Sequence, residues 1–214
     1  MRGRFFALEG IDGSGKSTQL PLLARRLEAL GRPCVQTREP TGGPMGTLLR
    51  QVLTGQVTCD SRVVAPLFVA DRLDHLLRKG DGLLALVEGG TDVLCDRYYF
   101  SSYAYQSVDL PLEWVIGANR PCADLLRPDA TLFLDVDPEL ALERIARGRD
   151  HTELFETRER LTRTREQYFR AFEAEKDRER ILILPGDLPP EELSRAIWAR
   201  VLPLLGEAPP RSPA

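Results

Sequence analysis

Residues 5–18 read FFALEGIDGSGKST, and this stretch decides the fold of the chain. The apolar run at 5–8 predicts a buried strand. Gly10 to Ser17 then match the whole pattern G-x-x-x-x-G-K-[S/T] of a loop that holds phosphate groups. The glycines let several N–H groups converge on one anion, Lys16 neutralises the outer phosphates, and the Ser17 hydroxyl is placed to ligate Mg²⁺. The expected ligand is a nucleoside triphosphate with its Mg²⁺ ion.

The segment after the loop has the apolar spacing of a helix. Leucines at 20, 22, 23, 27 and 30 recur at helical intervals, and Gly31 ends the pattern. A phosphate loop lies between a strand and a helix, so this context argues against a chance match in a glycine-rich turn. The residues expected to contact the triphosphate are Gly10, Ile11, Asp12, Gly13, Ser14, Gly15, Lys16, Ser17 and Thr18.

Length and composition indicate one globular domain. The chain has 214 residues, 43% of them hydrophobic; residues 1–206 suffice for one core, and the proline-rich segment 207–214 is expected to be a flexible tail. No apolar run approaches the roughly 18 residues that cross a bilayer, and the first residues carry no signal-peptide core. We expect a cytoplasmic protein with no membrane partner.

Cysteine spacing and net charge argue against a metal or redox cysteine site and against general nucleic-acid binding. The cysteines at 34, 59, 95 and 122 form no C-x-x-C pair and are expected to be free thiols. The formal net charge of −3 argues against a general nucleic-acid binder. The expected partner is a small anion rather than a polymer.

Short apolar runs alternate with longer amphipathic stretches, which is typical of an α/β fold with a parallel sheet between two helical layers. The five expected strands span 5–8, 33–36, 92–95, 131–135 and 180–184. The expected helices span 17–30, 43–53, 61–79, 82–88, 101–108, 112–118, 138–146, 156–176 and 191–205. Ligands of such sheets bind at the carboxyl ends of the strands.

Charged residues follow the strands at that edge. Asp96 comes directly after an apolar run, where phosphate-loop enzymes hold Mg²⁺ or its waters. If the acceptor also carries a phosphate, a cation such as the neighbouring Arg97 must lie between the two anions. The alternative is a surface salt bridge between Asp96 and Arg97. Arg38 ends the preceding strand, and its loop is expected either to bind an anion or to form an exposed turn.

The helix expected at 61–79 presents a candidate base-binding face. Phe68 and Arg72 are four residues apart, so a ring can stack on a base while a guanidinium reaches its carbonyl edge. The alternative is a core role for Phe68. The apolar residues of this helix spread beyond one face, which favours contact with a second subunit.

Arg144, Arg147 and Arg149 lie around Gly148 in a stretch with few apolar residues. We expect a lid at about 144–155, whose closure brings a guanidinium to the transferring phosphate. The alternative is an ordinary loop in which neighbouring carboxylates neutralise these arginines.

Five motifs, in this order, closely resemble those of thymidylate kinases: EGIDGSGKST at 9–18, TREP at 37–40, LFVADR at 67–72, DRY at 96–98 and AYQ at 104–106. The resemblance extends from residue 5 to about residue 200. It implies a P-loop nucleoside monophosphate kinase fold with a five-stranded parallel sheet, transfer of the γ-phosphate of MgATP to dTMP, and a homodimer.

The resemblance also implies roles at the phosphates. Lys16 and Ser17 would contact the triphosphate and Mg²⁺. Asp12 would meet the 3′-hydroxyl of the acceptor, and Arg38 and Arg97 would bind the acceptor phosphate.

Further implied roles concern the base and sugar of dTMP. Phe68 would stack on thymine, and Arg72 would donate to its O4. Ser102 and Gln106 resemble the bacterial pair around the remaining polar edge of the base. Tyr98 would lie where the family excludes a 2′-hydroxyl.

Members of the family take an additional cation either from the phosphate loop or from the lid. Gly13 and Ser14 occupy the loop positions here, so the resemblance is to bacterial-type members and the role falls to Arg147 or Arg149. The usual lid sequence of the family is Asp-Arg-x-Glu. In this chain His151 replaces the arginine of that sequence, and histidine is mostly neutral at pH 7. Which arginine acts is left open.

Other functions fit part of the sequence. A deoxynucleoside kinase, or another nucleoside monophosphate kinase, shares the sheet and the arginines. A deoxynucleoside kinase also needs a general base that deprotonates the neutral hydroxyl of its acceptor, and Glu39 or Glu9 could serve as this base. A nucleotide-dependent switch from another functional class needs a guanine-binding motif N-K-x-D, and the single asparagine, Asn119, fits none.

Overall fold

The computed structural model describes residues 2–148 and 157–206, and its centre is one parallel sheet. The strands are β1 (Phe5–Glu9), β2 (Cys34–Arg38), β3 (Asp92–Asp96), β4 (Ala130–Asp135) and β5 (Ile181–Pro185). They are hydrogen-bonded in the order β2-β3-β1-β4-β5, and every pairing is parallel. Each strand overlaps its predicted range, and the predicted α/β class is confirmed.

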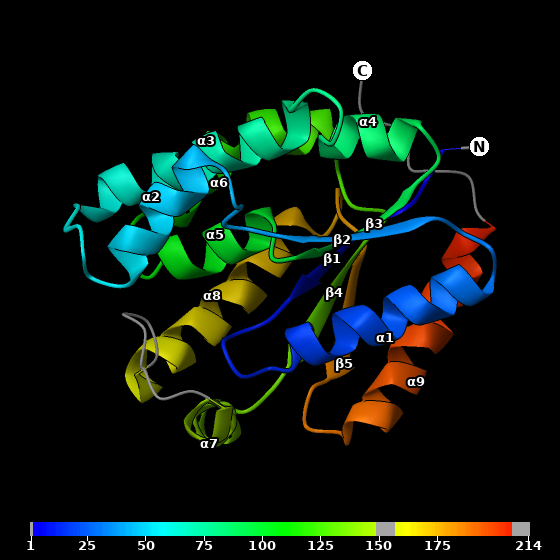
Figure 1. The fold of residues 1–214 in the computed structure, drawn as a ribbon. Coiled ribbons are helices and arrows are strands. Elements are labelled where there is room, and N and C mark those ends of the chain that lie inside the picture. Colours follow the sequence, from blue (N-terminus) through cyan, green and yellow to red (C-terminus); the bar gives the residue numbers. More distant parts are fainter. Residues whose placement is uncertain (1, 149–156, 207–214) are drawn as a thin grey trace.

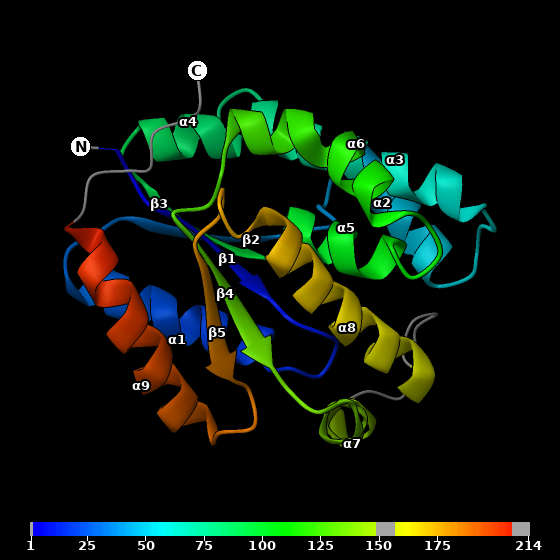
Figure 2. The ribbon, with the colours of Figure 1, turned by 180° about the vertical axis from the view of Figure 1, so that it is seen from behind.

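Helices cover both faces of the sheet (Figure 1, Figure 2). They are α1 (Lys16–Ala29), α2 (Pro44–Leu53), α3 (Ser61–Leu77), α4 (Leu83–Glu88), α5 (Tyr99–Gln106), α6 (Leu112–Leu125), α7 (Pro138–Gly148), α8 (Arg158–Glu175) and α9 (Pro190–Val201), followed by the 3₁₀ turn η1 (Leu202–Leu205). Helices α1 and α9 lie side by side on one face, while α3, α4, α5, α6 and α8 cover the other. The described part of the chain therefore has three layers.

The central strand β1 is buried on both of its faces. Phe6 and Leu8 pack with α1 and α9, whereas Phe5 and Ala7 pack with the helices of the opposite layer. Successive strand residues point to opposite faces, so a strand covered on both sides must be apolar throughout. This explains the unbroken apolar run that precedes the phosphate loop.

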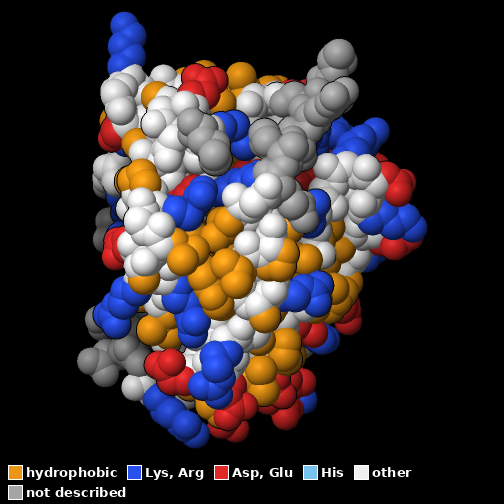
Figure 3. All heavy atoms as spheres, turned by 90° about the vertical axis from the view of Figure 1, so that its right-hand side faces the viewer, with side chains coloured by type: hydrophobic (Ala, Val, Ile, Leu, Met, Phe, Trp, Pro, Cys, Tyr) orange, Lys and Arg blue, Asp and Glu red, His pale blue; other side chains and the backbone are white. Residues whose placement is uncertain are grey.

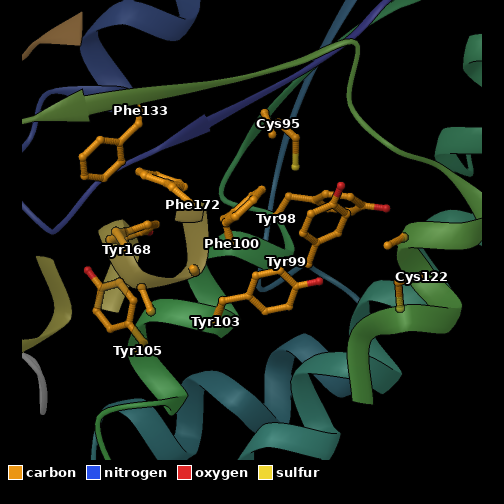
Figure 4. Close-up of a cluster of buried hydrophobic side chains, with 14 of the residues drawn as sticks. Cys95, Tyr98, Tyr99, Phe100, Tyr103, Tyr105, Cys122, Phe133, Tyr168 and Phe172 are labelled. Carbon is orange, nitrogen blue, oxygen red and sulfur yellow. The ribbon is translucent and has the colours of Figure 1, made fainter. Parts of the chain in front are cut away.

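Aromatic rings join α5 to α8 and to the sheet (Figure 4). The ring centroid of Phe133, in β4, lies 4.9 Å from that of Phe172 and 4.8 Å from that of Tyr168, both in α8. Phe172 in turn lies 5.2 Å from Phe100 in α5. Such pairs contribute about 0.5–1.5 kcal/mol each beyond the area they bury. The cluster fixes the position of α5, which carries several residues of the site described below.

Helix α6 is longer than the sequence predicted. The prediction ended it at residue 118, whereas the helix continues to Leu125. It does so although Pro121 lacks an N–H and disfavours a helix interior. Cys122, which follows the proline, is fully buried in the core. Burial of the second half of the helix thus outweighs the loss of one backbone hydrogen bond.

Figure 3 shows the side of the molecule at which α1 and α9 end. Hydrophobic side chains gather near its middle, and charged side chains of both signs lie around them. Within residues 2–148 and 157–206, no helix has the length and apolar character needed to span a membrane.

The carboxylate of Asp129, just before β4, connects the beginnings of β1 and β4. It accepts hydrogen bonds from the Phe5 N–H at 2.8 Å and from Arg4 Nη1 at 2.7 Å. The Asp129 side chain is only 2% exposed, so water does not replace these bonds.

Replacing Asp129 with alanine is therefore expected to lower the free energy of unfolding by about 3 kcal/mol, the cost of breaking a buried ion pair. Asp81→Ala is the matched control, because that carboxylate is 69% exposed and lies 3.7 Å from Arg78; its cost is expected to stay below about 1 kcal/mol. Urea unfolding followed by circular dichroism measures both. Equal losses would show that Asp129 does not anchor the sheet.

Candidate active site

Two cavities lie at the carboxyl ends of the strands and share part of their walls. The phosphate-loop cavity has a volume of about 700 Å³. Its lining includes Asp12, Gly13, Ser14, Gly15, Lys16, Ser17, Thr18, Gln19, Arg38, Asp96, Arg97, Arg144 and residues 186–190. The second, which we call the Phe68 cavity, has a volume of about 100 Å³. It is lined by Asp12, Glu39, Pro40, Leu53, Phe68, Arg72, Arg97, Ser101, Ser102, Tyr105 and Gln106.

The phosphate loop has the geometry that its glycines predicted. Gly13 has a φ of +78°, and a Cβ there would lie 2.3 Å from the carbonyl oxygen of Ala141. The Lys16 side chain folds back over the loop, with Nζ 2.9 Å from the Gly10 carbonyl oxygen and 3.0 Å from that of Ile11. Burial and the charge of Arg97 lower the pKa of Lys16 to about 8, against the opposing effect of nearby carboxylates. This ammonium group is thus held at the cavity wall by carbonyl groups that an anionic ligand can replace.

Asp96 and Ser17 both line the phosphate-loop cavity. Oδ1 of Asp96 is buried and has no hydrogen-bond partner within the described residues. Nor does Asp96 form an ion pair with Arg97 in this part of the chain, so the alternative of a surface salt bridge is wrong. A buried carboxylate oxygen with no partner is costly unless a cation or water meets it. Oxygen donors of this kind fit a Mg²⁺ ion, held directly or through its waters.

Arg97 lies at the wall common to the two cavities. Its φ of +69° is left-handed, and this turn follows directly on β3. The guanidinium donates through Nη2 to Asp12 Oδ1 at 2.6 Å, and through Nη1 to the Gly10 carbonyl and Ser101 Oγ, each at 3.1 Å. A left-handed non-glycine residue costs about 1–3 kcal/mol. Here the surrounding hydrogen bonds hold it in place.

Tyr105 completes this arrangement from α5. Its hydroxyl lies 2.8 Å from Asp12 Oδ2 and 3.1 Å from Arg97 Nη2. The Arg97 guanidinium also lies over the Tyr105 ring, 4.8 Å from its centroid. Burial alone would raise the pKa of Asp12, but the charges of Arg97 and Lys16 and the Tyr105 hydrogen bond lower it below its ordinary value. Asp12 is therefore an ionised acceptor beside a fixed cation.

The Phe68 cavity brings together four of the predicted base-binding residues. Phe68 and Arg72 come from α3, and Ser102 and Gln106 come from α5. Oε1 of Gln106 is buried and has no hydrogen-bond partner within the described residues. The cavity thus offers an aromatic ring, a guanidinium and an unused amide oxygen.

Arg72 is 1% exposed, and its guanidinium is held on several sides. Nε donates to Glu39 Oε2 at 2.7 Å, and Nη1 donates to Ser102 Oγ at 3.2 Å and to Oδ1 of Asn119. Burial would lower the pKa of Arg72, but the Glu39 charge raises it above its ordinary value. A permanently charged donor thus faces the cavity in one orientation.

The predicted role of Tyr98 beside the sugar is not supported. Tyr98 is 1% exposed and lines neither cavity. Its hydroxyl donates to the Leu126 carbonyl at 3.0 Å, and its ring lies 5.3 Å below the Arg72 guanidinium carbon. Tyr98 directly precedes α5 and lies in the core, whereas Tyr105, near the end of that helix, lines the Phe68 cavity. Sequence reasoning quoted Tyr105 within a motif but gave it no role.

Arg38 is exposed and lines the phosphate-loop cavity but not the Phe68 cavity. It makes no ion pair with any described residue. This position fits contact with phosphate rather than with a base.

The two lid arginines within the described residues have different positions. Arg144 lines the phosphate-loop cavity and donates to the Gly186 carbonyl at 2.8 Å. Arg147 does not line it; its side chain is 78% exposed and lies 3.4 Å from Glu143. Arg149 and most of the predicted lid, together with the predicted tail, lie outside the described residues. Of the two described lid arginines, Arg144 lies at the cavity, whereas Arg147, one of the two favoured from the sequence, does not.

Two carboxylates considered as bases are already engaged. Glu9 is fully buried, lines neither cavity, and accepts from Ser101 Oγ at 2.6 Å and Tyr168 Oη at 2.8 Å. Burial raises its pKa, although these hydrogen bonds and the Arg97 charge oppose the shift. Glu39 lines the Phe68 cavity but is bound to Arg72. Their place after strand ends was visible in the sequence, whereas their partners were not.

Known proteins resemble this chain over the range that contains both cavities. A family model described as thymidylate kinase matches residues 8–197. The putative thymidylate kinase of Aeropyrum pernix is 44% identical over 168 residues, which cover 77% of this chain and 76% of that protein. The thymidylate kinase of Thermomicrobium roseum is 35% identical over 199 residues, covering 92% and 93%. The probable thymidylate kinase of Pyrobaculum calidifontis is 42% identical over 172 residues, covering 80% and 83%.

Neither the match nor the site depends on one motif, since the phosphate loop, the arginine after β3 and the Phe68 cavity all lie within the matched range. The chain belongs to the thymidylate kinase family.

Proposed function

We propose that this protein transfers the γ-phosphate of ATP to dTMP, giving dTDP and ADP. The observation that carries the proposal is the shared wall of the two cavities, formed by Asp12 and Arg97. Two anions that react with each other need a cation between them. Arg97 is the guanidinium in that position, and family membership supports dTMP as the acceptor.

The phosphate-loop cavity would take ATP. The loop N–H groups and Lys16 would bind its β- and γ-phosphates. Arg144 and residues 186–190 line the same cavity and would hold the remainder of the nucleotide. Ser17 and Asp96 would hold Mg²⁺, which when bound neutralises charge on the phosphates.

The Phe68 cavity would take the thymine base. Phe68 would stack on its face, and Arg72 would donate to O4. Gln106 Oε1, which has no partner in the described structure, would accept the N3–H of the base, with Ser102 beside it. Arg97 and Arg38 would then bind the phosphate of dTMP, and Asp12 its 3′-hydroxyl.

The other functions considered from the sequence are less well supported. A deoxynucleoside kinase needs a carboxylate that is free to deprotonate the neutral hydroxyl of its acceptor. Both candidates, Glu9 and Glu39, are engaged in hydrogen bonds. A guanine-dependent switch needs an asparagine at the nucleotide base, yet Asn119 lies in α6 and accepts from Arg72.

We further propose that the protein works in the cytoplasm as a homodimer. Val63 and Leu77 of α3 are 50% and 57% exposed, and Trp114 of α6 is 44% exposed. Exposed apolar residues on these helices fit a subunit contact.

The acceptor test is direct. With MgATP, the purified protein is expected to phosphorylate dTMP at least about 100-fold faster than dCMP, dGMP, AMP or thymidine. A site built to bond one base edge strongly rejects a base that lacks the partner groups, and thymidine lacks the phosphate that Arg38 and Arg97 would bind. A coupled assay of ADP formation measures each acceptor, and omission of acceptor is the control. Similar rates across the panel, or fast hydrolysis without acceptor, would contradict the proposal.

Two variants distinguish the role of Tyr105 at the cavity from that of Tyr98 in the core. Tyr105→Phe removes the hydroxyl that bonds Asp12 and Arg97, and kcat/KM for dTMP is expected to fall about 10-fold. Tyr98→Phe loses only the bond to a backbone carbonyl, so stability should fall by about 1 kcal/mol with kcat/KM changed less than about twofold. Steady-state kinetics and thermal unfolding separate the two. A larger kinetic effect from Tyr98→Phe would restore the original prediction.

Alanine variants of the lid arginines assign their roles. Arg147→Ala or Arg149→Ala is expected to lower kcat by about 10³-fold, as loss of a transition-state arginine does. Arg144→Ala should mainly raise KM for ATP. Arg170→Ala is the control, because Arg170 is exposed on α8 and lines neither cavity. If neither Arg147→Ala nor Arg149→Ala lowers kcat more than a few-fold, neither arginine acts in the transition state.

A further inference from the structure

His75 of α3 lies behind Arg72, outside the walls of both cavities. It is 4% exposed. Its Nδ1 lies 3.0 Å from Glu39 Oε1, and its Nε2 lies 2.8 Å from the Thr37 hydroxyl oxygen. The proposed reaction uses none of these His75 contacts, yet they form a continuous chain from β2 to Arg72.

The direction of the hydrogen bonds follows from the chemistry of Glu39. A carboxylate bound to a guanidinium acts as a hydrogen-bond acceptor, so Nδ1 of His75 must be the donor. Nε2 then accepts from the Thr37 hydroxyl when the ring is neutral. The chain therefore runs Thr37 to His75 to Glu39 to Arg72, with one proton at each link.

This chain determines how Glu39 binds Arg72. An arginine and a carboxylate tend to pair through two parallel hydrogen bonds. Here Oε2 accepts from Nε of Arg72, while Oε1 lies 3.0 Å from Nδ1 of His75 and accepts no hydrogen bond from Arg72. Nη1 is bound to Ser102 and Asn119, and Nη2 makes no hydrogen bond to any described residue. With Oε1 directed to His75, Glu39 engages only one guanidinium nitrogen of Arg72.

We propose that His75, acting through Glu39, is a positioning residue that keeps an Arg72 nitrogen free for the base of the acceptor. The inference rests on the proposed function, in which Arg72 donates to O4 of thymine. Glu39 directly follows Arg38, so the same contact also holds the end of β2, which carries this proposed phosphate-binding residue.

A metal site is the other arrangement that these residues suggest. Ligand atoms of Glu39, His75 and Cys95 all lie within 4.8 Å of one another, and no ion is present. The Cys95 thiol, however, donates to the Arg97 carbonyl at 3.0 Å, and the Glu39 carboxylate is bound to the Arg72 cation. With each donor engaged and a cation adjacent, the cluster favours a hydrogen-bond chain over a second cation.

The test compares His75→Leu with His75→Asn. Leucine fills the space but cannot donate, so KM for dTMP is expected to rise about 10-fold while KM for ATP changes less than about twofold. The ratio of kcat/KM for dTMP over dCMP should fall about 10-fold, because a displaced guanidinium no longer distinguishes O4 from an amino group. Asparagine retains an N–H at the Nδ1 position and should restore most of both losses.

Thr37→Val removes the first hydroxyl of the hydrogen-bond chain and gives a second measurement where His75→Leu folds poorly. KM for dTMP and the preference for dTMP over dCMP are expected to change in the same direction as in His75→Leu, but only about threefold. Asp74→Asn is the control, because Asp74 lies on the same helix in a partly exposed ion pair with Arg78. Thermal unfolding is measured for every variant.

Several results would overturn the proposal. These are an unchanged dTMP preference in both His75→Leu and Thr37→Val, equal changes in KM for ATP and dTMP, no recovery in His75→Asn, or a stoichiometric metal ion in the wild type that His75→Leu loses. Failure of the proposed function appears separately, as similar turnover of dTMP and dCMP by the wild type, and it removes the positioning role as well.

Discussion

The ion pair between Arg97 and Asp12 is the interaction on which the rest of the site depends. Its 2.6 Å contact joins the turn after β3 to the phosphate loop after β1, and it forms part of both cavity walls. Removing either partner would leave a largely buried charge, which is strongly destabilising. Because β1 and β3 are neighbours in the sheet, the strand order itself brings these two residues together.

Most charges near this pair are compensated within the protein. Arg72 is matched by Glu39, while Glu9 is stabilised by hydroxyl groups and a backbone N–H. Asp96 Oδ1 and Gln106 Oε1 differ, since both are buried without a hydrogen-bond partner in the described residues. Native proteins rarely leave such atoms unpaired unless a ligand or water meets them. Each lies in a different cavity, where Mg²⁺ and a base N–H respectively are proposed.

The sequence was informative where function depends on local geometry. Gly13 and Lys16 act within one loop, and Asp96 comes at the end of a recognisable strand, so their positions followed from pattern alone. Tyr98 and Tyr105 could not be distinguished in this way, because the packing of the turn after β3 and of α5 decides which of them faces the cavity.

Other features depend on packing between distant segments, which a single sequence does not show. The continuation of α6 past Pro121 follows from burial of Cys122. The engagement of Glu39 by His75 requires β2 and α3 to meet. The approach of Arg144, rather than Arg147, to the phosphate-loop cavity depends on the position of the Gly186 carbonyl beyond β5.

In the proposed function, recognition of the acceptor base and the chemistry of transfer depend on different parts of the chain. Arg72 can be held without water only because Glu39, Ser102 and Asn119 surround it, and those partners come from three parts of the fold. Such a site is fixed by the core and tolerates little change. Arg147 has no comparable support, since its side chain is exposed and pairs only with Glu143 within the described residues. Under the proposed function, variation in the lid sequence, such as His151, is therefore expected to alter the transfer step while recognition of the base stays the same.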